Sequence, residues 1–326
     1  MRAAFLGPAG TYSHEALVGD PRAAGWEPIP MPTVFDAVLA VEEGTTERAL
    51  VPIENSLEGA VGPTLDALAV ETERVRIVGE VVHPIRHALI AREPLALSDV
   101  RVVLSHPQAN AQCARFIRAE LPGATVLAVA STAEAVRLVA AGEVPGGPAA
   151  ALGTPVAAEL HGGVVLRAGV EDGPGNVTRF VWLAPAGEPA MPAPEAAPAP
   201  VAKTSVVWWG SGDVAPGWLV RCLSEFAFRG VNLTRIESRP RRLGLGHYMF
   251  FADLEGDAAT ASATGVPAAA LGAQAETVKV LGSYPAAARG SGPRPRRPVA
   301  DGHPAPPAMP RGLDGPDGRV SCATLP

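Results

Sequence analysis

The chain has 326 residues, more than one hydrophobic core usually organises, so two folded units are expected. Hydrophobic residues make up 47% of the sequence and charged residues 18%, which is typical of a soluble globular protein. The formal net charge of -6 argues against nucleic acid as the main partner, because phosphate backbones bind to basic faces.

The cysteines and the N-terminus indicate the compartment. Cys113, Cys222 and Cys322 are far apart and form no CxxC pair, so neither a disulfide framework nor a zinc site is expected. The first apolar run is broken at Gly7 and Pro8, which makes it too short for a signal peptide. No window approaches the roughly 20 apolar residues of a membrane span. The sequence therefore predicts a cytoplasmic protein with no metal site and no membrane partner.

Two proline-rich stretches divide the chain. Residues 184–200 contain six prolines, which block a helix and favour an extended linker. The C-terminal stretch is rich in proline and glycine and is expected to be disordered. The predicted organisation is a folded unit over 1–183, a linker over 184–202, a second folded unit over 203–285 and a disordered tail over 286–326.

Apolar strand patterns alternate with helical patterns in the first unit, which predicts an α/β fold with mostly parallel strands. The expected strands are 2–6, 49–53, 100–105, 149–152 and 178–183. The expected helices lie near 12–19, 34–43, 63–70, 107–121, 131–141 and 154–160. Ligands of such folds bind where strands lead into helices, so polar residues at these junctions are the candidates for a site.

The first junction carries Gly7, Thr11 and Ser13 in the sequence GPAGTYS. Glycine permits a tight turn, and the free N–H groups of the following helix can bind an anion. The Lys-Ser/Thr ending of a phosphate-binding P-loop is missing. The alternative interpretation is a turn in which threonine or serine only caps the helix.

The second junction places Glu54, Asn55 and Ser56 at the end of an apolar strand, in the sequence VPIENSLEG. Three consecutive polar residues at this position are candidates for contacts with a ligand. The alternative is that Asn55 and Ser56 shape a turn, as these residue types often do.

The third junction, SHPQANAQC, begins with Ser105 and His106. Pro107 fits the first turn of a helix, where its missing N–H costs nothing. Gln108 and Gln112 are four residues apart, so they lie on one helix face, near the strand end that carries Ser105. His106 is either a base or a residue that caps the helix.

The fourth junction, GPGNVTRF, leads from a glycine-rich loop into an apolar strand that contains Thr178, Arg179 and Phe180. A guanidinium group can bind a carboxylate with two parallel hydrogen bonds, which makes Arg179 the candidate for fixing an acidic substrate. The alternative is a surface arginine beside a loop.

The second unit shows the order βαββαβ of a ferredoxin-like domain. Its expected elements are strand 204–209, helix 216–229, strands 232–239 and 247–255, a weak helix over 257–275 and strand 277–281.

The four junction motifs, in this order and spacing, resemble the motif set of prephenate dehydratases. FRGVNLTRIESRP and LGSYP look like the regulatory ACT domain of that family. The resemblance implies two α/β lobes like those of a type-two periplasmic binding protein, followed by a ferredoxin-like ACT domain. It also implies that prephenate loses carbon dioxide and water to give phenylpyruvate, without a cofactor.

The resemblance assigns roles to residues of the matching motifs. It implies that the catalytic residues are Thr178, Asn55, Ser105 and Gln112. It implies that the substrate-binding residues are Arg179, Thr11, Ser13, Glu54, Ser56 and Phe180. Hydroxyl and amide donors stabilise charge on a departing oxygen, and Thr178 is expected to donate a hydrogen bond or a proton to the leaving hydroxyl.

Phenylalanine is the effector that the resemblance implies. Its site would consist of Glu237, Ser238, Arg239 and Pro240 with Gly217, Trp218, Leu219 and Val220. The family has alanine at the position of Trp218. An indole inside the effector pocket would fill the space of the ligand, so phenylalanine is expected to inhibit poorly. The alternative is that Trp218 faces solvent and changes nothing.

Two other functions fit the sequence. Arogenate, the amino analogue of prephenate, is an alternative substrate, and a non-catalytic binding module is an alternative class because two-lobed folds often only capture solutes. The family resemblance also implies a homodimer or homotetramer that pairs through its ACT domains.

Overall fold

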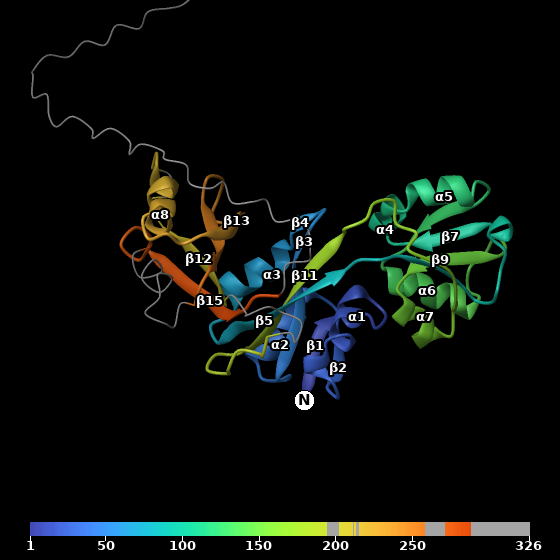
Figure 1. The fold of residues 1–326 in the computed structure, drawn as a ribbon, viewed down its shortest axis with the longest axis horizontal. Coiled ribbons are helices and arrows are strands. Elements are labelled where there is room, and N and C mark those ends of the chain that lie inside the picture. The colour runs from blue at the N-terminus through green and yellow to red at the C-terminus, as the bar shows by residue number, and fades with distance from the viewer. Residues whose placement is uncertain (194–201, 211, 213–214, 258–270, 288–326) are drawn as a thin grey trace, which may run out of the picture. The chain divides into compact units, whose positions relative to one another are not determined.

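The computed structural model describes residues 1–193, 202–210, 212, 215–257 and 271–287. Within them the chain forms three β-sheets, which are named here the first lobe, the second lobe and the C-terminal sheet (Figure 1). Most of the weak helix expected over 257–275 and nearly all of the expected tail lie outside the described residues. No helix in the described part is long and apolar enough to cross a membrane.

The first lobe is a sheet with the strand order β2-β1-β3-β11-β5, and a short strand β4 pairs with β3. Its strands are β1 (Arg2–Leu6), β2 (Glu27–Met31), β3 (Arg48–Asn55), β4 (Gly59–Ala60), β5 (Val75–Pro84) and β11 (Val177–Pro185). Its helices are α1 (Tyr12–Val18), α2 (Val34–Glu42) and α3 (Gly62–Asp66), with short turns η1 (Pro21–Ala23) and η2 (Ala67–Glu71). Helices α1 and α2 pack into two separate hydrophobic clusters. The central strands are consequently buried almost throughout, which explains their continuous apolar runs.

The second lobe is a sheet with the strand order β10-β6-β9-β7-β8. Its strands are β6 (Ala88–Ala91), β7 (Val102–Ser105), β8 (Thr125–Ala128), β9 (Ala149–Gly153) and β10 (Val164–Ala168). Its helices are α4 (Pro107–Gln112), α5 (Ala114–Glu120), α6 (Thr132–Ala141) and α7 (Pro155–His161), with a turn η3 (Leu97–Asp99). Helices α6 and α7 cover one face of the sheet and α5 covers the other (Figure 1).

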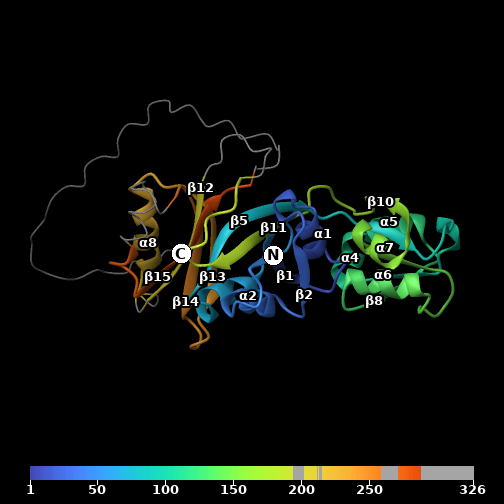
Figure 2. The same cartoon turned by 90° about the horizontal axis from the view of Figure 1, so that it is seen from below.

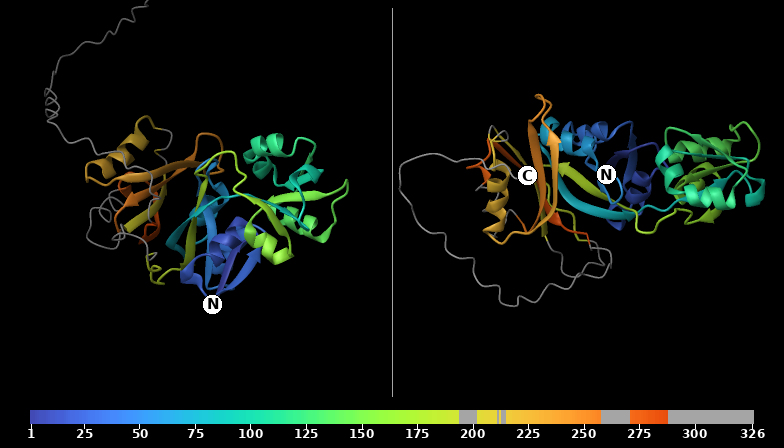
Figure 3. Two further views of the ribbon diagram at one scale, coloured as in Figure 1. Left: turned by 45° about the vertical axis from the view of Figure 1, so that its right-hand side comes forward. Right: turned by 90° about the horizontal axis from the view of Figure 1, so that it is seen from above.

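Both lobes have mixed sheets, so the prediction of mostly parallel strands is wrong for part of each sheet. β11 runs antiparallel to both β3 and β5, and β6 runs antiparallel to β9 and β10. The reason is the path of the chain. It leaves the first lobe through β5 and returns through β11, so these two long strands run in opposite directions (Figure 3). Six strands of the two lobes had not been predicted from the sequence, namely β2, β4, β5, β6, β8 and β10.

The C-terminal sheet has the order β13-β14-β12-β15, and all neighbouring strands are antiparallel. Its elements are β12 (Ala202–Trp209), α8 (Trp218–Ala227), β13 (Leu233–Pro240), β14 (Tyr248–Glu255) and β15 (Thr277–Pro285). Helix α8 covers one face (Figure 2). Apolar residues of the other face share a core with the first lobe. The predicted fold class, a two-lobed α/β region followed by a ferredoxin-like sheet, is confirmed.

The first folded region extends further than residue 183. Strand β11 ends at Pro185, and Met191 is buried against the first lobe. The backbone N–H of Met191 donates to the Val78 carbonyl at 2.7 Å. The proline-rich segment therefore begins as a chain that lies against the lobe, and the predicted linker can start only after this contact.

Candidate active site

The side chain of Asn55 fixes the direction of a series of hydrogen bonds at the end of β3. Its Oδ1 accepts from the backbone N–H groups of Leu57 and Glu58, at 2.9 and 3.0 Å. Backbone N–H groups can only donate, so the Asn55 amide orientation is determined. Its Nδ2 must donate, and it does so to Thr178 Oγ1 at 2.9 Å and to Asn176 Oδ1 at 2.8 Å.

The series continues from the first lobe to the second. Asn176 Nδ2 donates to Gln112 Oε1 at 3.2 Å, and the same oxygen lies 2.9 Å from His87 Nε2. Because the Gln112 oxygen accepts, His87 carries its hydrogen on Nε2, and its Nδ1 accepts. Tyr12 Oη lies 2.6 Å from Nδ1 and supplies that hydrogen bond, and the Arg86 carbonyl is a second, longer acceptor of the same hydroxyl at 3.1 Å. The polar chain, defined as Tyr12, His87, Gln112, Asn176, Asn55 and Thr178, thus links residues of both lobes.

The two titratable members of the polar chain are neutral at pH 7. Burial lowers the pKa of His87, and the hydrogen bond to Gln112 offsets this only in part. Burial, followed by the charge of Glu15, raises the pKa of Tyr12 well above its ordinary value. A neutral imidazole is required for the hydrogen-bond directions given above, so geometry and electrostatics agree.

Two side chains of the polar chain have a donor hydrogen that forms no hydrogen bond to another member of it. Thr178 Oγ1 accepts from Asn55, which leaves its own hydroxyl hydrogen free to point elsewhere. Gln112 Nε2 is buried and has no hydrogen-bond partner among the described residues. Buried donors are nearly always paired, so an unpaired one calls for a bound group. The site can therefore donate two hydrogen bonds to an oxygen-rich ligand.

The comparison with protein families decides what this site belongs to. The family model described as prephenate dehydratase matches residues 3–188, which include every member of the polar chain. The chain belongs to the prephenate dehydratase family. Relatives in the family include the prephenate dehydratase of Mycobacterium leprae, which is 38% identical in an alignment of 296 residues that covers 87% of this chain and 87% of the relative. That of Mycobacterium tuberculosis is 37% identical in an alignment of 297 residues, with the same coverage of both chains.

Solved structures show the same similarity. The prephenate dehydratase of Arthrobacter aurescens, solved in complex with L-Phe, has a TM-score of 0.77 and 37% identity and covers 89% of this chain and 90% of its own. The Staphylococcus aureus enzyme has a TM-score of 0.70 and 27% identity, with coverage of 87% and 100%. A protein described as a novel type of quorum quenching acylase has a TM-score of 0.73 and 30% identity, with coverage of 88% and 98%.

Several residues of the dehydratase motifs have structural contacts in this chain. Ser105 is fully buried and donates to the Leu152 carbonyl at 2.8 Å, which ties β7 to β9. Thr11 caps α1 and donates to the Leu6 carbonyl. Ser13 is buried in α1. Ser56 Oγ accepts from the Val177 N–H at 3.0 Å. Within the described residues, no side-chain hydrogen bond joins these four to the polar chain, and their predicted roles stay predictions.

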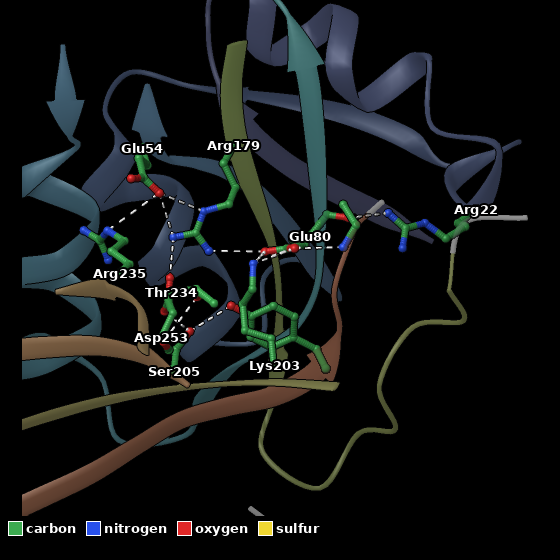
Figure 4. A network of polar contacts seen from close by, with 11 residues as sticks. Arg22, Glu54, Glu80, Arg179, Lys203, Ser205, Thr234, Arg235 and Asp253 are labelled. Carbon is green, nitrogen blue, oxygen red and sulfur yellow. Dashed lines mark hydrogen bonds and ion pairs between the residues drawn. The ribbon is translucent and has the colours of Figure 1, made fainter. Parts of the chain in front are cut away.

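Arg179, Glu54 and Phe180 lie apart from the polar chain. Phe180 is buried in the core of the first lobe. Arg179 pairs with Glu54 across β11 and β3, and its guanidinium is held by carboxylates (Figure 4). Arg179, which was predicted to bind a carboxylate of the substrate, is thus bound to carboxylates of the protein itself.

Three members of the polar chain were not identified from the sequence as members of the site. Tyr12 and Asn176 lie inside the quoted motifs GPAGTYS and GNVTRF, next to residues that were selected. His87 lies between β5 and β6, two strands that were not predicted. The available signal for His87 was a histidine directly before an apolar run. Within the described residues, no group of three or more metal-binding side chains occurs.

The predicted effector residues lie in two places, at the start of α8 and on β13. Gly217 precedes α8 with a φ of 75°, and Trp218 to Val220 form the first turn of this helix. Trp218 is 4% exposed, so the alternative that it faces solvent is wrong. Leu219 is partly buried and Val220 is exposed. Glu237, Ser238 and Pro240 lie with Arg239 on β13, and Arg239 forms an ion pair with Asp66 at 2.8 Å.

Proposed function

We propose that this chain converts prephenate to phenylpyruvate, carbon dioxide and water. The observation that carries the proposal is the polar chain of a prephenate dehydratase family member, with free donors on Thr178 and Gln112. Prephenate carries two carboxylates and a ring hydroxyl, all of which accept hydrogen bonds. The reaction needs no redox change, because loss of carbon dioxide supplies the electrons that complete the aromatic ring.

The leaving hydroxyl requires the strongest support from the protein. As the bond between the ring carbon and this hydroxyl breaks, negative charge develops on the oxygen, which leaves as water after gaining one proton. The electrons of the bond between the ring and its carboxylate form the new ring double bond, and carbon dioxide departs. We assign to the Thr178 hydroxyl the role of donor to the departing oxygen, a kind of interaction that typically contributes about 10²–10³ in rate.

Asn55 and Gln112 complete the proposed site. Asn55 donates to Thr178 Oγ1, which leaves the threonine hydrogen available to the substrate. Gln112 is held by His87 and Asn176 through its oxygen, which presents its Nε2 hydrogens to a substrate oxygen. Donors held in place before the reaction cost no reorganisation when charge develops.

A single assay tests the proposed function. Purified full-length chain is mixed with prephenate, and phenylpyruvate is followed by its absorbance. We expect catalytic turnover with prephenate, and a parallel reaction with arogenate measures the preference between the two substrates. A protein that binds prephenate but releases no aromatic product would be a binding module, and the proposal would then be wrong.

Phenylalanine is the proposed effector, and the proposed assembly is a homodimer or homotetramer. Support for the ligand comes from the similar Arthrobacter aurescens structure, which contains L-Phe. Because the Trp218 ring occupies the space below the first turn of α8, we propose that phenylalanine inhibits this chain weakly.

The acid side of the pH profile tests the role of His87. Protonation would place a hydrogen on Nδ1 and remove the acceptor of the Tyr12 hydroxyl. Since burial holds the pKa of His87 below 6.5, we expect kcat/KM to be constant near pH 7 and to fall about tenfold per pH unit below that pKa. The unfolded state binds the proton first, so the free energy of unfolding should also decrease as pH falls below 6.5.

His87→Gln is the matched control for this profile. Glutamine retains a donor and an acceptor but has no titration in this range. The acid limb assigned to His87 should therefore disappear in the variant, after subtraction of the uncatalysed rate. An unchanged limb would assign the titration to another group.

A further inference from the structure

Thr178 and Arg179 are neighbours on β11, so their side chains leave opposite faces of the sheet. In the register of β11 with β3, Thr178 lies opposite Asn55 and Arg179 lies opposite Glu54. The first pair belongs to the polar chain. The second pair faces the C-terminal sheet, where Arg179 contacts Asp253 of β14.

All three guanidinium nitrogens of Arg179 are bound by carboxylates. Nε lies 3.1 Å from Glu54 Oε2, Nη1 lies 3.2 Å from Glu80 Oε2, and Nη2 lies 2.6 Å from Asp253 Oδ2. The side chains of Glu80 and Asp253 are 1% and 3% exposed. Figure 4 shows Arg179 at the centre of this network, between strands of the first lobe and of the C-terminal sheet. Moving a buried guanidinium away from its carboxylates would leave uncompensated charges, so these contacts hold the Arg179 side chain in place.

The charges of the network balance. Its cations are Arg179, Lys203 and Arg235, and its anions are Glu54, Glu80 and Asp253. Ser205 Oγ donates to Asp253 Oδ1 at 2.6 Å and lies 2.8 Å from the Tyr284 hydroxyl. Burial would raise the pKa of Asp253, but the charges of Arg179 and Arg235 hold it below its ordinary value. Asp253 is therefore a charged residue of the C-terminal sheet that binds Arg179 of β11.

We propose that Asp253 is a positioning residue of the dehydratase site, which acts on Thr178 through Arg179. The pairing of β11 with β3 shifts register between Arg179 and Phe180. Such an irregularity bends the strand locally, whereas the pairing of β11 with β5 is regular from Val177 to Trp182. The ladders therefore set the position of the backbone, and the ion pair to Asp253 adds a side-chain constraint directly beside Thr178, at the bend. This inference rests on the proposed function.

Asp253→Asn in the full-length chain tests the inference. The amide keeps the shape of the side chain but removes one of the three carboxylate charges that bind Arg179. We expect kcat to fall about ten- to a hundredfold, as for a displacement of roughly 1 Å at a catalytic group, while KM changes less than about twofold. Arg179→Gln should show the same pattern. If Arg179 bound a substrate carboxylate, Arg179→Gln would instead raise KM, and the inference would be wrong.

A double-mutant cycle identifies Arg179 as the intermediary. In an Arg179→Gln background, Asp253→Asn should change kcat by less than about twofold, because the residue through which it acts is already absent. Effects that multiply in the double variant would show that Asp253 acts independently of Arg179, which contradicts the proposal.

Lys279→Met is the control for general loosening of the C-terminal sheet. Lys279 Nζ donates to the Leu68 carbonyl at 2.6 Å and to the Thr72 carbonyl, so it also joins this sheet to the first lobe. We expect its kcat to stay within about twofold of wild type. An equal loss in Lys279→Met and Asp253→Asn would mean that docking in general, not the ion pair, supports catalysis.

A milder variant keeps the test valid if Asp253→Asn does not fold. Ser205→Ala removes one hydrogen bond from Asp253 and leaves all charges in place. Its kcat should fall by about two- to tenfold with KM unchanged, on the scale of one hydrogen bond to a charged group. A wild-type kcat in folded Ser205→Ala, together with either no fold or wild-type kcat in Asp253→Asn, would overturn the inference. An inactive wild-type chain would instead overturn the proposed function.

Discussion

Replacing Thr178 with alanine is expected to lower kcat by about a hundredfold or more, with a much smaller change in KM. Thr178 Oγ1 already accepts from Asn55 Nδ2, so its own hydrogen is not used in that bond. In the proposed reaction this hydrogen bond strengthens as charge develops on the departing hydroxyl. Its loss therefore removes stabilisation that is larger in the transition state than in the bound substrate.

Two further variants separate the hydroxyl from the shape of the side chain. Thr178→Ser retains the donor and should keep kcat within about tenfold of wild type. Thr178→Val retains the shape without the donor and should be as inactive as the alanine variant. Phenylpyruvate formation in stopped assays and circular dichroism of each variant provide the measurements. Near-normal turnover of folded Thr178→Val would remove Thr178 from the mechanism.

The sequence predicted the fold class and the order of its parts because the local patterns agree with the final packing. The runs at β1, β3 and β9 are continuously apolar and are buried in the sheets. Prolines at the starts of α4 and α7 mark where these helices begin. Strand β5 was missed because Arg76, Gly79 and Glu80 interrupt its apolar pattern, and β6 was missed because its apolar run has only four residues.

Three of the predicted site residues lie together in the structure. Asn55, Gln112 and Thr178 belong to one hydrogen-bonded chain, although 57 or more residues separate each from the next in sequence. The alternation of side chains in a strand separates others. Thr178 and Arg179 are consecutive strand residues, so their side chains leave opposite faces of the sheet, and the same holds for Glu54 and Asn55. The predicted roles of Arg179 and Glu54 stay predictions. The partner of Arg179 could not be predicted, because Asp253 lies 74 residues later, in a different sheet.

Trp218→Ala is expected to reduce the free energy of unfolding by about 3–5 kcal/mol, as is typical of a buried tryptophan. Trp218 is 4% exposed and lies in the core between α8 and the C-terminal sheet, with its ring 5.9 Å from that of Phe250. Its Nε1 donates to the Gln274 carbonyl at 2.7 Å. Alanine would leave both a cavity and an unpaired carbonyl, and the two losses act in the same direction.

Urea unfolding followed by circular dichroism measures the loss, and Val220→Ala is the matched control. Val220 lies two residues later on α8 but is 65% exposed, so its truncation should change the free energy of unfolding by about 0.5 kcal/mol or less. The C-terminal sheet should unfold first in Trp218→Ala, before the two lobes. Gly212 supports the same view of the packing, because a Cβ at that position would lie 2.1 Å from Trp218 Cδ1. If Trp218→Ala is as stable as Val220→Ala, the ring does not support this core, and it then becomes a candidate for direct contact with phenylalanine.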